Sequence, residues 1–432
     1  MSGSQPTEAK ADSVRIRDYL YSLRNTGSKY GIERMYRFAA ALGNPQRAFP
    51  SIHVAGTNGK GSVCAILEAL YRSNGYKTGL YTSPHLVHLG ERVQVNREIL
   101  SEAAINQTIP QLIATAEALS QEDPDDHPSF FELMTATAFL EFAAQNVDIA
   151  LIETGLGGRL DATNILQPEL SIITSISLDH TEILGNDLDT IAFEKAGIIK
   201  ANTPVLLGKL APEAEAVIRK VAAERNAPVH SVKERFSDFD ALPKTNLEGS
   251  FQRWNAGLAV YASELLAPRF PLKSTEALQD IDWAGRWQRL QLNDRQLILD
   301  ATHNPEGVEM LAENLENLAQ ASDQKPIVIA GTLGADRGRA LMPVLAQYAR
   351  EIHLLAPAQE RALSTEALAR LIPNDFQGPI IEDRIDRLFP SPNQCAAGQA
   401  GDTILVTGSL YLIGEVLQQL QGANKNNLQD KP

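Results

Sequence analysis

A lysine lies between two glycines in the stretch SIHVAGTNGKGSVCAI, residues 51–66. The stretch differs from the standard phosphate-binding loop G-x-x-x-x-G-K-[ST], because Gly61 separates Lys60 from Ser62. A strand candidate precedes it and an apolar-periodic helix follows, so backbone N–H groups and the helix dipole would favour a bound phosphate. The alternative is a glycine turn that only joins strand to helix, although a lysine is unfavourable at a helix N-terminus. We expect a nucleotide-phosphate site, with Lys60 on the outer phosphates and Ser62 Oγ near a magnesium ion.

Polar groups follow other strand candidates and would gather near this loop. Glu153 lies in the apolar run VDIALIET, and Asp179 and His180 follow LSIITSI. Because open α/β sheets bind ligands at the carboxyl ends of their strands, Ser62, Glu153 and His180 are expected at one edge. A buried carboxylate is costly without a partner, and Mg²⁺ would be such a partner. A solvated glutamate and a plain hydrogen-bonding histidine are the alternatives that these residues leave open.

Two further polar side chains belong to the same half of the chain. Ser83 ends the strand candidate in YTSPHL, and its hydroxyl is a possible ligand for a metal or a phosphate. Lys195, in FEKAGIIK, is expected at the start of a helix. From spacing alone, the favoured interpretation of Lys195 is a solvated helical lysine paired with Glu194.

The stretch LILDATHNPEGVEML, residues 297–311, carries a similar pattern in the second half of the chain. A strand is expected to end at Asp300. Asn304 then fits a helix N-cap, with Pro305 at the first helical position. Capping explains Asn304 and Pro305 without any function, but it does not explain Asp300 or His303.

The elements that must position these residues alternate between strands and helices. Strand candidates cover residues 51–56, 77–83, 147–154, 170–176, 203–208, 295–301, 326–331, 351–357 and 402–408. Their short, continuous apolar runs are typical of buried parallel strands, and the helical stretches between them predict βαβ units.

The alternation breaks between about 230 and 290. The polar stretch 231–250 predicts a small hairpin region, and a helix and a linker with an edge strand follow. We expect an α/β protein with two domains. Residues 1–293 form a P-loop-type domain with a mostly parallel sheet, and residues 294–432 form a smaller Rossmann-like α/β domain.

Composition excludes several classes of protein. The formal net charge of −14 disfavours a nucleic-acid coat or a binder of anionic membranes. Cys64 and Cys395 form neither a disulfide framework nor a zinc motif, so a reducing, cytoplasmic location is expected. The polar start, residues 1–13, is no signal peptide, no apolar run is long enough to span a membrane, and the tail 421–432 is expected to be disordered.

Several motifs together resemble the folylpolyglutamate synthase/dihydrofolate synthase family of the Mur ligase superfamily. They run in order from about residue 30 to 416: VAGTNGKGSV, YTSPHL, ERVQVN, SFFELMT, ETGLGGRLDATN, TSISLDHTEILG, EKAGIIK, FQRWNAGLA, GRWQ, LDATHNP and VTGSLYLIGEV. The phosphate loop with its altered spacing is itself typical of this superfamily. The resemblance implies an ATP-dependent ligase with Mg²⁺ as cofactor. ATP would phosphorylate a carboxylate of dihydropteroate or of a folate, and the amine of L-glutamate would attack the acyl phosphate.

The resemblance also implies roles for individual residues. It assigns ATP to Asn58, Gly59, Lys60, Gly61, Ser62, Asn255, Arg286 and Asp300, and magnesium to Ser62, Ser83, Glu153 and His180. It assigns catalysis to Lys60, His180 and Lys195, and the folate to Phe131, Glu132, Leu160, Asp161 and Ala162. Lys195 matches a lysine that is carbamylated in relatives, which would reverse the interpretation from spacing alone.

One departure and two alternatives remain. The stretch GTLGADRGR, residues 331–339, lacks the Asp-Lys-Asp that many relatives carry, which leaves the glutamate-binding residues unassigned. A Mur-type ligase with a peptidoglycan precursor as substrate would share the ATP half of the site. A non-catalytic P-loop nucleotide sensor would bind ATP without glutamate-dependent phosphate release. We expect a monomer that acts on small molecules and binds no nucleic acid.

Overall fold

The computed structural model describes residues 16, 18–20, 22–23, 31–322 and 324–422, and it divides into two compact units. Unit 1 comprises residues up to 85, 89–244 and 254–278, and unit 2 comprises residues 86–88, 245–253 and 279 onward. The predictions for residues 1–13 and for the tail beyond residue 422 lie outside the described residues. Within the described ranges, no helix is long and apolar enough to cross a bilayer.

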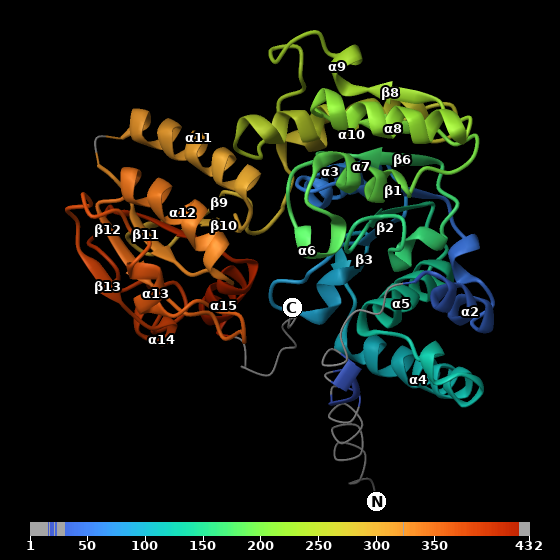
Figure 1. Ribbon diagram of the computed structural model, residues 1–432, viewed down its shortest axis with the longest axis horizontal. Helices are drawn as coiled ribbons and strands as arrows, with labels where there is room; N and C mark the ends of the chain where they lie inside the picture. Colours follow the sequence, from blue (N-terminus) through green and yellow to red (C-terminus); the bar gives the residue numbers. More distant parts are fainter. Residues whose placement is uncertain (1–15, 17, 21, 24–30, 323, 423–432) are drawn as a thin grey trace, which may run out of the picture. The chain divides into compact units, whose positions relative to one another are not determined.

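Unit 1 is built on an eight-stranded sheet in the order β4-β3-β2-β5-β1-β6-β7-β8 (Figure 1). The strands are β1 (Ser51–Ala55), β2 (Thr78–Tyr81), β3 (Val93–Val95), β4 (Glu98–Ile99), β5 (Ile149–Glu153), β6 (Leu170–Ile173), β7 (Val205–Leu207) and β8 (Val229–Ser231). Neighbours from β2 to β8 pair in parallel, whereas β3 and β4 are antiparallel. Every residue of β1, β5 and β6 is buried, so both faces of the sheet are covered, as the apolar runs predicted.

Unit 1 also contains helices, several of which pack on this sheet. They are α2 (Glu33–Ala41), α3 (Lys60–Ser73), α4 (Glu102–Glu122), α5 (Phe130–Ala144), α6 (Thr181–Leu184), α7 (Leu188–Ala196), α8 (Pro212–Glu224), α9 (Val232–Arg235) and α10 (Ser250–Leu266). Short 3₁₀ turns are η1 (Pro45–Arg47), η2 (Leu89–Arg92), η3 (Pro124–Asp126), η4 (Ala162–Ile165) and η5 (Glu276–Gln279). Ile191 of α7 and Ile218 of α8 share one apolar cluster with Val205 and Leu207 of β7. Burial of this cluster holds the two helices on the sheet.

Two local predictions for unit 1 are wrong. Lys195 lies in the last turn of α7 rather than at its start, because the helix begins at the Asp187 N-cap, which accepts a hydrogen bond from Thr190 N at 2.7 Å. The stretch 231–250 forms no hairpin. Instead β8 extends the sheet in parallel to β7, and α9 and turns follow it. Phe236 and Leu242 in these turns are buried, which fixes the segment by packing rather than by strand pairing.

Unit 2 contains a six-stranded sheet in the order β13-β12-β11-β14-β10-β9. The strands are β9 (Gln288–Gln291), β10 (Gln296–Asp300), β11 (Ile327–Ala330), β12 (Glu351–Leu354), β13 (Ile380–Glu382) and β14 (Thr403–Thr407). The helices are α11 (Pro305–Ala321), α12 (Ala335–Tyr348), α13 (Thr365–Ala369), α14 (Ile385–Leu388) and α15 (Leu410–Gln421). Leu297 and Leu299 of β10 pack in one apolar cluster, and Ile298 packs in another. This alternation shows that helices cover both faces of the sheet, as expected for a Rossmann-like domain.

The two units divide earlier in the chain than the predicted boundary between residues 293 and 294. Strand β9 pairs antiparallel with β10, from Gln288 opposite Leu299 to Gln291 opposite Gln296. The predicted edge strand therefore belongs to the sheet of unit 2. The predicted cap of α11 is confirmed, since Asn304 Oδ1 accepts a hydrogen bond from Gly307 N at 2.9 Å.

His53 is a buried polar residue in the middle of β1. It is completely buried, and its Nε2 lies 2.8 Å from Thr163 Oγ1. Burial lowers the pKa of His53 to about 3, and the nearby charge of Lys200 acts in the same direction. The imidazole is therefore neutral in the folded chain at any pH near neutrality.

We expect His53 to make the fold acid-sensitive. Its pKa is lower in the folded chain than in the unfolded chain, so between about pH 6.5 and pH 3 the unfolded chain binds more protons. The free energy of unfolding should therefore fall as the pH falls, by on the order of 2 kcal/mol between pH 7 and pH 5. Urea unfolding at both pH values should show a smaller fall in His53→Gln than in the wild type. His230→Gln, on edge strand β8, is the control that should keep the wild-type difference; an unchanged difference in His53→Gln would contradict the assignment.

Candidate active site

The candidate site lies at the carboxyl edge of the sheet of unit 1. Strands β2, β5, β1 and β6 are consecutive neighbours and run in parallel. The segments that follow them leave the sheet at the same edge. These segments carry Ser83, Glu153, the glycine-rich loop 56–62 and the stretch 174–180.

The glycine-rich loop is fastened to the segment after β6. Thr57 N donates to Ser175 O at 2.8 Å, Asn58 N donates to Ser175 Oγ at 3.0 Å, and Thr174 Oγ1 donates to Asn58 O at 2.6 Å. These hydrogen bonds tie the loop to the segment that follows the neighbouring strand of the sheet. Residues 58–61 remain partly exposed at the N-terminus of α3, where a phosphate would be stabilised by backbone N–H groups.

Gly59 is required where this loop turns into α3. Its φ of 85° lies in the left-handed region, which disfavours side chains. A Cβ at this position would lie 2.6 Å from Asn255 Oδ1, so a larger residue would also displace Asn255. Asn255 of α10 therefore lies against the glycine-rich loop. Its predicted contact with nucleotide stays a prediction.

Two lysine side chains converge on one backbone carbonyl of this loop. Lys60 Nζ donates to Gly56 O at 3.0 Å and to Thr57 O at 3.1 Å. Lys195 Nζ donates to the same Gly56 O at 2.9 Å, and Lys195 is only 4% exposed. The interpretation of Lys195 as a solvated partner of Glu194 is therefore wrong.

Glycines bring Lys195 into the interior. Glu194 instead accepts hydrogen bonds from the Arg159 guanidinium at 3.0 and 2.8 Å. A Cβ on Gly197 would overlap Arg159, so the end of α7 packs directly on the loop 158–159. Gly158 and Gly197, on the two sides of this contact, are the sequence signal for the burial of Lys195, but only the fold shows that they meet.

The four predicted magnesium ligands come from four segments of this edge. Ser83 N donates to Glu153 Oε2 at 3.1 Å, and Glu153 is 5% exposed. Burial raises the pKa of the Cys64 thiol. Of the nearby charges, Glu153 raises this pKa further and Lys60 lowers it. Both charges thus act on the first turns of α3, where Ser62 is buried. Serine hydroxyls and a carboxylate fit a hard cation such as Mg²⁺.

His180 is the one exposed residue among the predicted magnesium ligands. It is the N-cap residue of α6 with a φ of 49°, and its side chain is 43% exposed. The described residues hold no cluster of three or more His, Cys, Asp and Glu side chains, and the predicted set contains only two of these types. Oxygen atoms of Ser62, Ser83 and Glu153 therefore account for most of the fit to magnesium.

The predicted folate residues border the same edge. The half-buried Phe131 ring packs on Gly155, where a Cβ would overlap it, and its centroid lies 6.1 Å from that of Tyr81. Leu160 is partly exposed in the loop after β5, whereas Ala162 is buried in η4. Phe131, Gly155 and Leu160 thus expose apolar surface beside the glycine-rich loop's edge of the sheet.

Asp161 holds the loop after β5 in shape. Its Oδ2 accepts hydrogen bonds from Gly155 N and Leu156 N, both at 2.9 Å, and its Oδ1 accepts from Thr163 N at 3.0 Å. Burial raises the pKa of Asp161, although these hydrogen bonds oppose the rise. Thr163 Oγ1 also donates to Asp161, which extends the contact to His53. The sequence analysis did not predict the contact between His53 and Thr163, because the two residues are 110 positions apart in the chain.

Arg286 and Asp300 belong to unit 2. Asp300 is buried and accepts hydrogen bonds from Trp287 N at 3.0 Å and Thr302 N at 3.1 Å. Burial raises the pKa of Asp300, whereas the charge of Arg286 lowers it. The hydrogen bonds from Trp287 N and Thr302 N therefore give Asp300 a structural role, which helix capping did not explain. Its contact with nucleotide, and that of Arg286, stay predictions.

Comparison with known proteins identifies the family. The Mur ligase middle domain matches residues 54–256, and the Mur ligase glutamate ligase domain matches residues 285–410. This chain belongs to the Mur ligase superfamily. It is 34% identical to the dihydrofolate synthase/folylpolyglutamate synthase of Bacillus subtilis, with 94% of this chain and 98% of that protein covered.

Solved structures agree with this family. Folylpolyglutamate synthase of Thermotoga maritima matches with a TM-score of 0.80 and 29% identity, covering 95% of this chain and 97% of that one. E. coli FolC in complex with DHPP and ADP matches with a TM-score of 0.79 and 27% identity, covering 94% and 98%. The predicted fold class and family are confirmed, and the chain is an ATP-dependent ligase. The comparisons do not favour a peptidoglycan ligase or a non-catalytic sensor.

We predict that Lys60→Ala lowers kcat by at least about 100-fold, because the variant loses the cation beside the proposed phosphate site at the start of α3. Phosphate release from ATP measures the loss, and circular dichroism checks that the fold is intact. Lys77→Ala is the matched control, since Lys77 directly precedes β2 at the opposite edge of the same sheet. A Lys60→Ala variant with normal rates would remove the phosphate-site assignment.

Proposed function

We propose that this ligase joins L-glutamate to dihydropteroate and to the terminal glutamate of folates, at the expense of ATP. The carrying observation is the carboxyl edge of the sheet, where a glycine-rich loop, two lysines on Gly56 O and the Ser83–Glu153 contact gather. The matched relatives with these activities in their names cover nearly the whole chain, which supports the same substrate class.

The chemistry needs charge neutralisation more than covalent help from the protein. A substrate carboxylate oxygen attacks the γ-phosphorus of ATP, the bond to the bridging oxygen breaks, and ADP leaves. The amine of L-glutamate then attacks the acyl carbon, phosphate leaves, and an amide remains after loss of a proton. Because two anions must meet in the first step, Lys60 and the N–H groups at the start of α3 lower the barrier by offsetting their repulsion.

Magnesium is the proposed cofactor. Ser62, Ser83, Glu153 and His180 would hold it, and it would supply further neutralisation of phosphate charge. The order of strands β2, β5, β1 and β6 brings the segments that carry these residues to the edge of the sheet where Lys60 lies.

The substrate's pterin end is proposed to rest on the surface formed by Phe131 and the loop after β5. Aromatic rings stack favourably on flat heterocycles, and the ring of Phe131 is half-exposed. Leu160, Asp161 and Ala162 are proposed to border the substrate. The Asp161 carboxylate already accepts several hydrogen bonds from its own loop, so its contribution is to hold the backbone of residues 155–156 in place.

The proposed function is tested by phosphate release in the presence of ATP, Mg²⁺ and L-glutamate. Release is expected with dihydropteroate and with tetrahydrofolate, and it should require glutamate. A UDP-sugar peptide should give none, which separates this ligase from peptidoglycan ligases. Release with only one pterin substrate would restrict the function to that activity, and release with neither would overturn the proposal. We expect the active form to be a monomer.

We also propose that Lys195 is carbamylated. Neutral Nζ attacks CO₂ and loses a proton, which converts a buried cation beside Gly56 O into a carboxylate at the same edge of the sheet as the proposed magnesium ligands. A negative group at this position would add an oxygen ligand, which a lysine ammonium cannot do.

Lys195→Ala is expected to lose most of its activity and to regain part of it when acetate is added, because a free carboxylate can occupy the vacated space. Initial rates with and without acetate measure the rescue. Lys200→Ala is the control, since Lys200 Nζ donates to Asn164 O at 2.6 Å, and acetate should not change its rate. Full activity of Lys195→Ala without acetate would count against carbamylation.

A further inference from the structure

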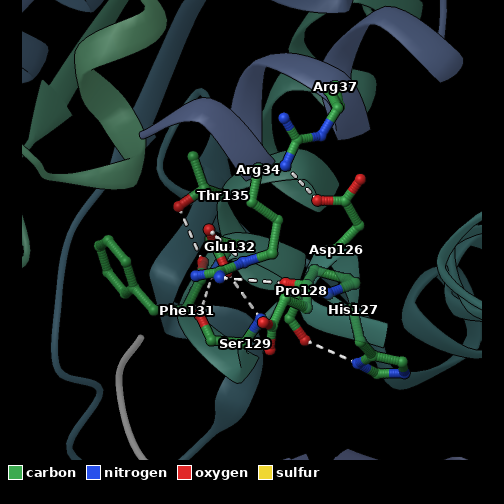
Figure 2. A network of polar contacts seen from close by, with 10 residues as sticks. Arg34, Arg37, Asp126, His127, Pro128, Ser129, Phe131, Glu132 and Thr135 are labelled. Atoms are coloured by element: carbon green, nitrogen blue, oxygen red, sulfur yellow. Dashed lines mark hydrogen bonds and ion pairs between the residues drawn. The ribbon is translucent and has the colours of Figure 1, made fainter. Parts of the chain in front are cut away.

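A buried ion pair joins helix α2 to the first turn of α5 (Figure 2). Arg34 is 7% exposed and Glu132 is 4% exposed. Arg34 Nε donates to both oxygens of the Glu132 carboxylate, at 3.0 and 2.9 Å. The two residues are 98 positions apart in the sequence, so the pair is a tertiary contact.

The helix end does not need this pair for its own hydrogen bonds. Ser129 and Glu132 form a capping box, in which Ser129 N donates to Glu132 Oε2 at 2.7 Å and Glu132 N donates to Ser129 Oγ at 3.3 Å. A buried ion pair loses hydration, and apolar residues of similar volume are often at least as stabilising. Stability alone therefore does not explain Arg34, whereas the geometry that it imposes on Glu132 does.

The turn that Arg34 fixes carries the Phe131 side chain. Phe131 lies between Ser129 and Glu132 in the sequence, and its carbonyl oxygen accepts a hydrogen bond from Thr135 Oγ1 at 2.8 Å. The Tyr81 hydroxyl lies 3.0 Å from the same Thr135 Oγ1. In Figure 2 the Phe131 ring points away from the ion pair. The polar contacts thus hold the backbone of the turn, while the ring stands free of them against Gly155.

We propose that Arg34 is a positioning residue for the pterin end of the substrate. Arg34 holds the Glu132 carboxylate, Glu132 sets the first turn of α5, and this turn sets the angle of the Phe131 ring. Glu132 then acts through the backbone of the turn rather than through its own contact with folate. The inference rests on the proposed function, because it takes the Phe131 surface as the place of the pterin.

The test compares steady-state kinetics of four variants with the wild type. Arg34→Met combined with Glu132→Met replaces the pair by apolar side chains, and Arg34→Lys keeps the charge but loses the planar guanidinium. Arg37→Gln is the matched control, because Arg37 lies on α2 like Arg34, pairs with Asp126 of η3 and has a side chain that is 52% exposed. Phe131→Leu reports the loss of the ring itself.

We expect the double variant to raise KM for dihydropteroate about tenfold, with kcat and KM for ATP within about twofold of the wild type. Phe131→Leu should show the same pattern, Arg34→Lys a smaller rise in the same KM, and Arg37→Gln none. If the ion pair had only a structural role, the double variant would have a lower melting temperature but no selective rise in KM for dihydropteroate.

Wild-type KM in a folded double variant would overturn the inference, and so would wild-type KM in Arg34→Lys if the double variant does not fold. Either result with an active wild type leaves the proposed function standing. A wild type that releases no phosphate with any pterin substrate would instead remove the proposed function, and this inference with it.

Discussion

The shared contact of Lys60 and Lys195 with Gly56 O is the interaction on which the candidate site depends. While Lys195 is unmodified, two ammonium groups on one carbonyl oxygen concentrate positive charge where the glycine-rich loop enters α3. Like charges repel, so such an arrangement persists only where the surrounding fold holds both side chains in place. The loop is fastened to the segment after β6, and α7 packs on the loop after β5 through glycines. Carbamylation of Lys195 would leave Lys60 as the cation of the pair, so the charge beside Gly56 O depends on the state of Lys195.

Local patterns predicted the elements well because those elements are locally encoded. Short apolar runs marked β1, β5 and β6, and Asn304 with Pro305 marked the start of α11. The order of the strands then brings Ser83 beside Glu153, as the common edge required. Predictions that needed packing between distant segments were less successful. The burial of Lys195 depends on close packing at Gly158 and Gly197, which are far apart in the sequence. The pairing of β9 with β10 places β9 in unit 2, so this unit begins earlier in the chain than predicted.

Polar residues of the predicted site divide into those that face a ligand and those that hold the backbone. Glu132, Asp161 and Asp300 all have carboxylates that accept backbone N–H groups inside the fold. A motif cannot separate the two kinds, because both are polar residues in the same short stretches. The distinction comes from tertiary hydrogen bonds, such as those from Arg34 to Glu132. The partly exposed ring of Phe131 and the partly exposed residues 58–61 at the start of α3 then remain as the proposed surfaces for substrates.

Each unit carries a single cysteine in its interior. Cys64 is buried in α3 of unit 1, and Cys395 is buried in an apolar cluster of unit 2. Burial raises the pKa of both thiols, and the thiolate is the reactive form, so alkylating reagents should label neither one in the folded chain. Labelling at Cys64 or at Cys395 would then mark the opening of one unit independently of the other. The chain thus contains its own pair of reporters for local unfolding, without any engineered residue.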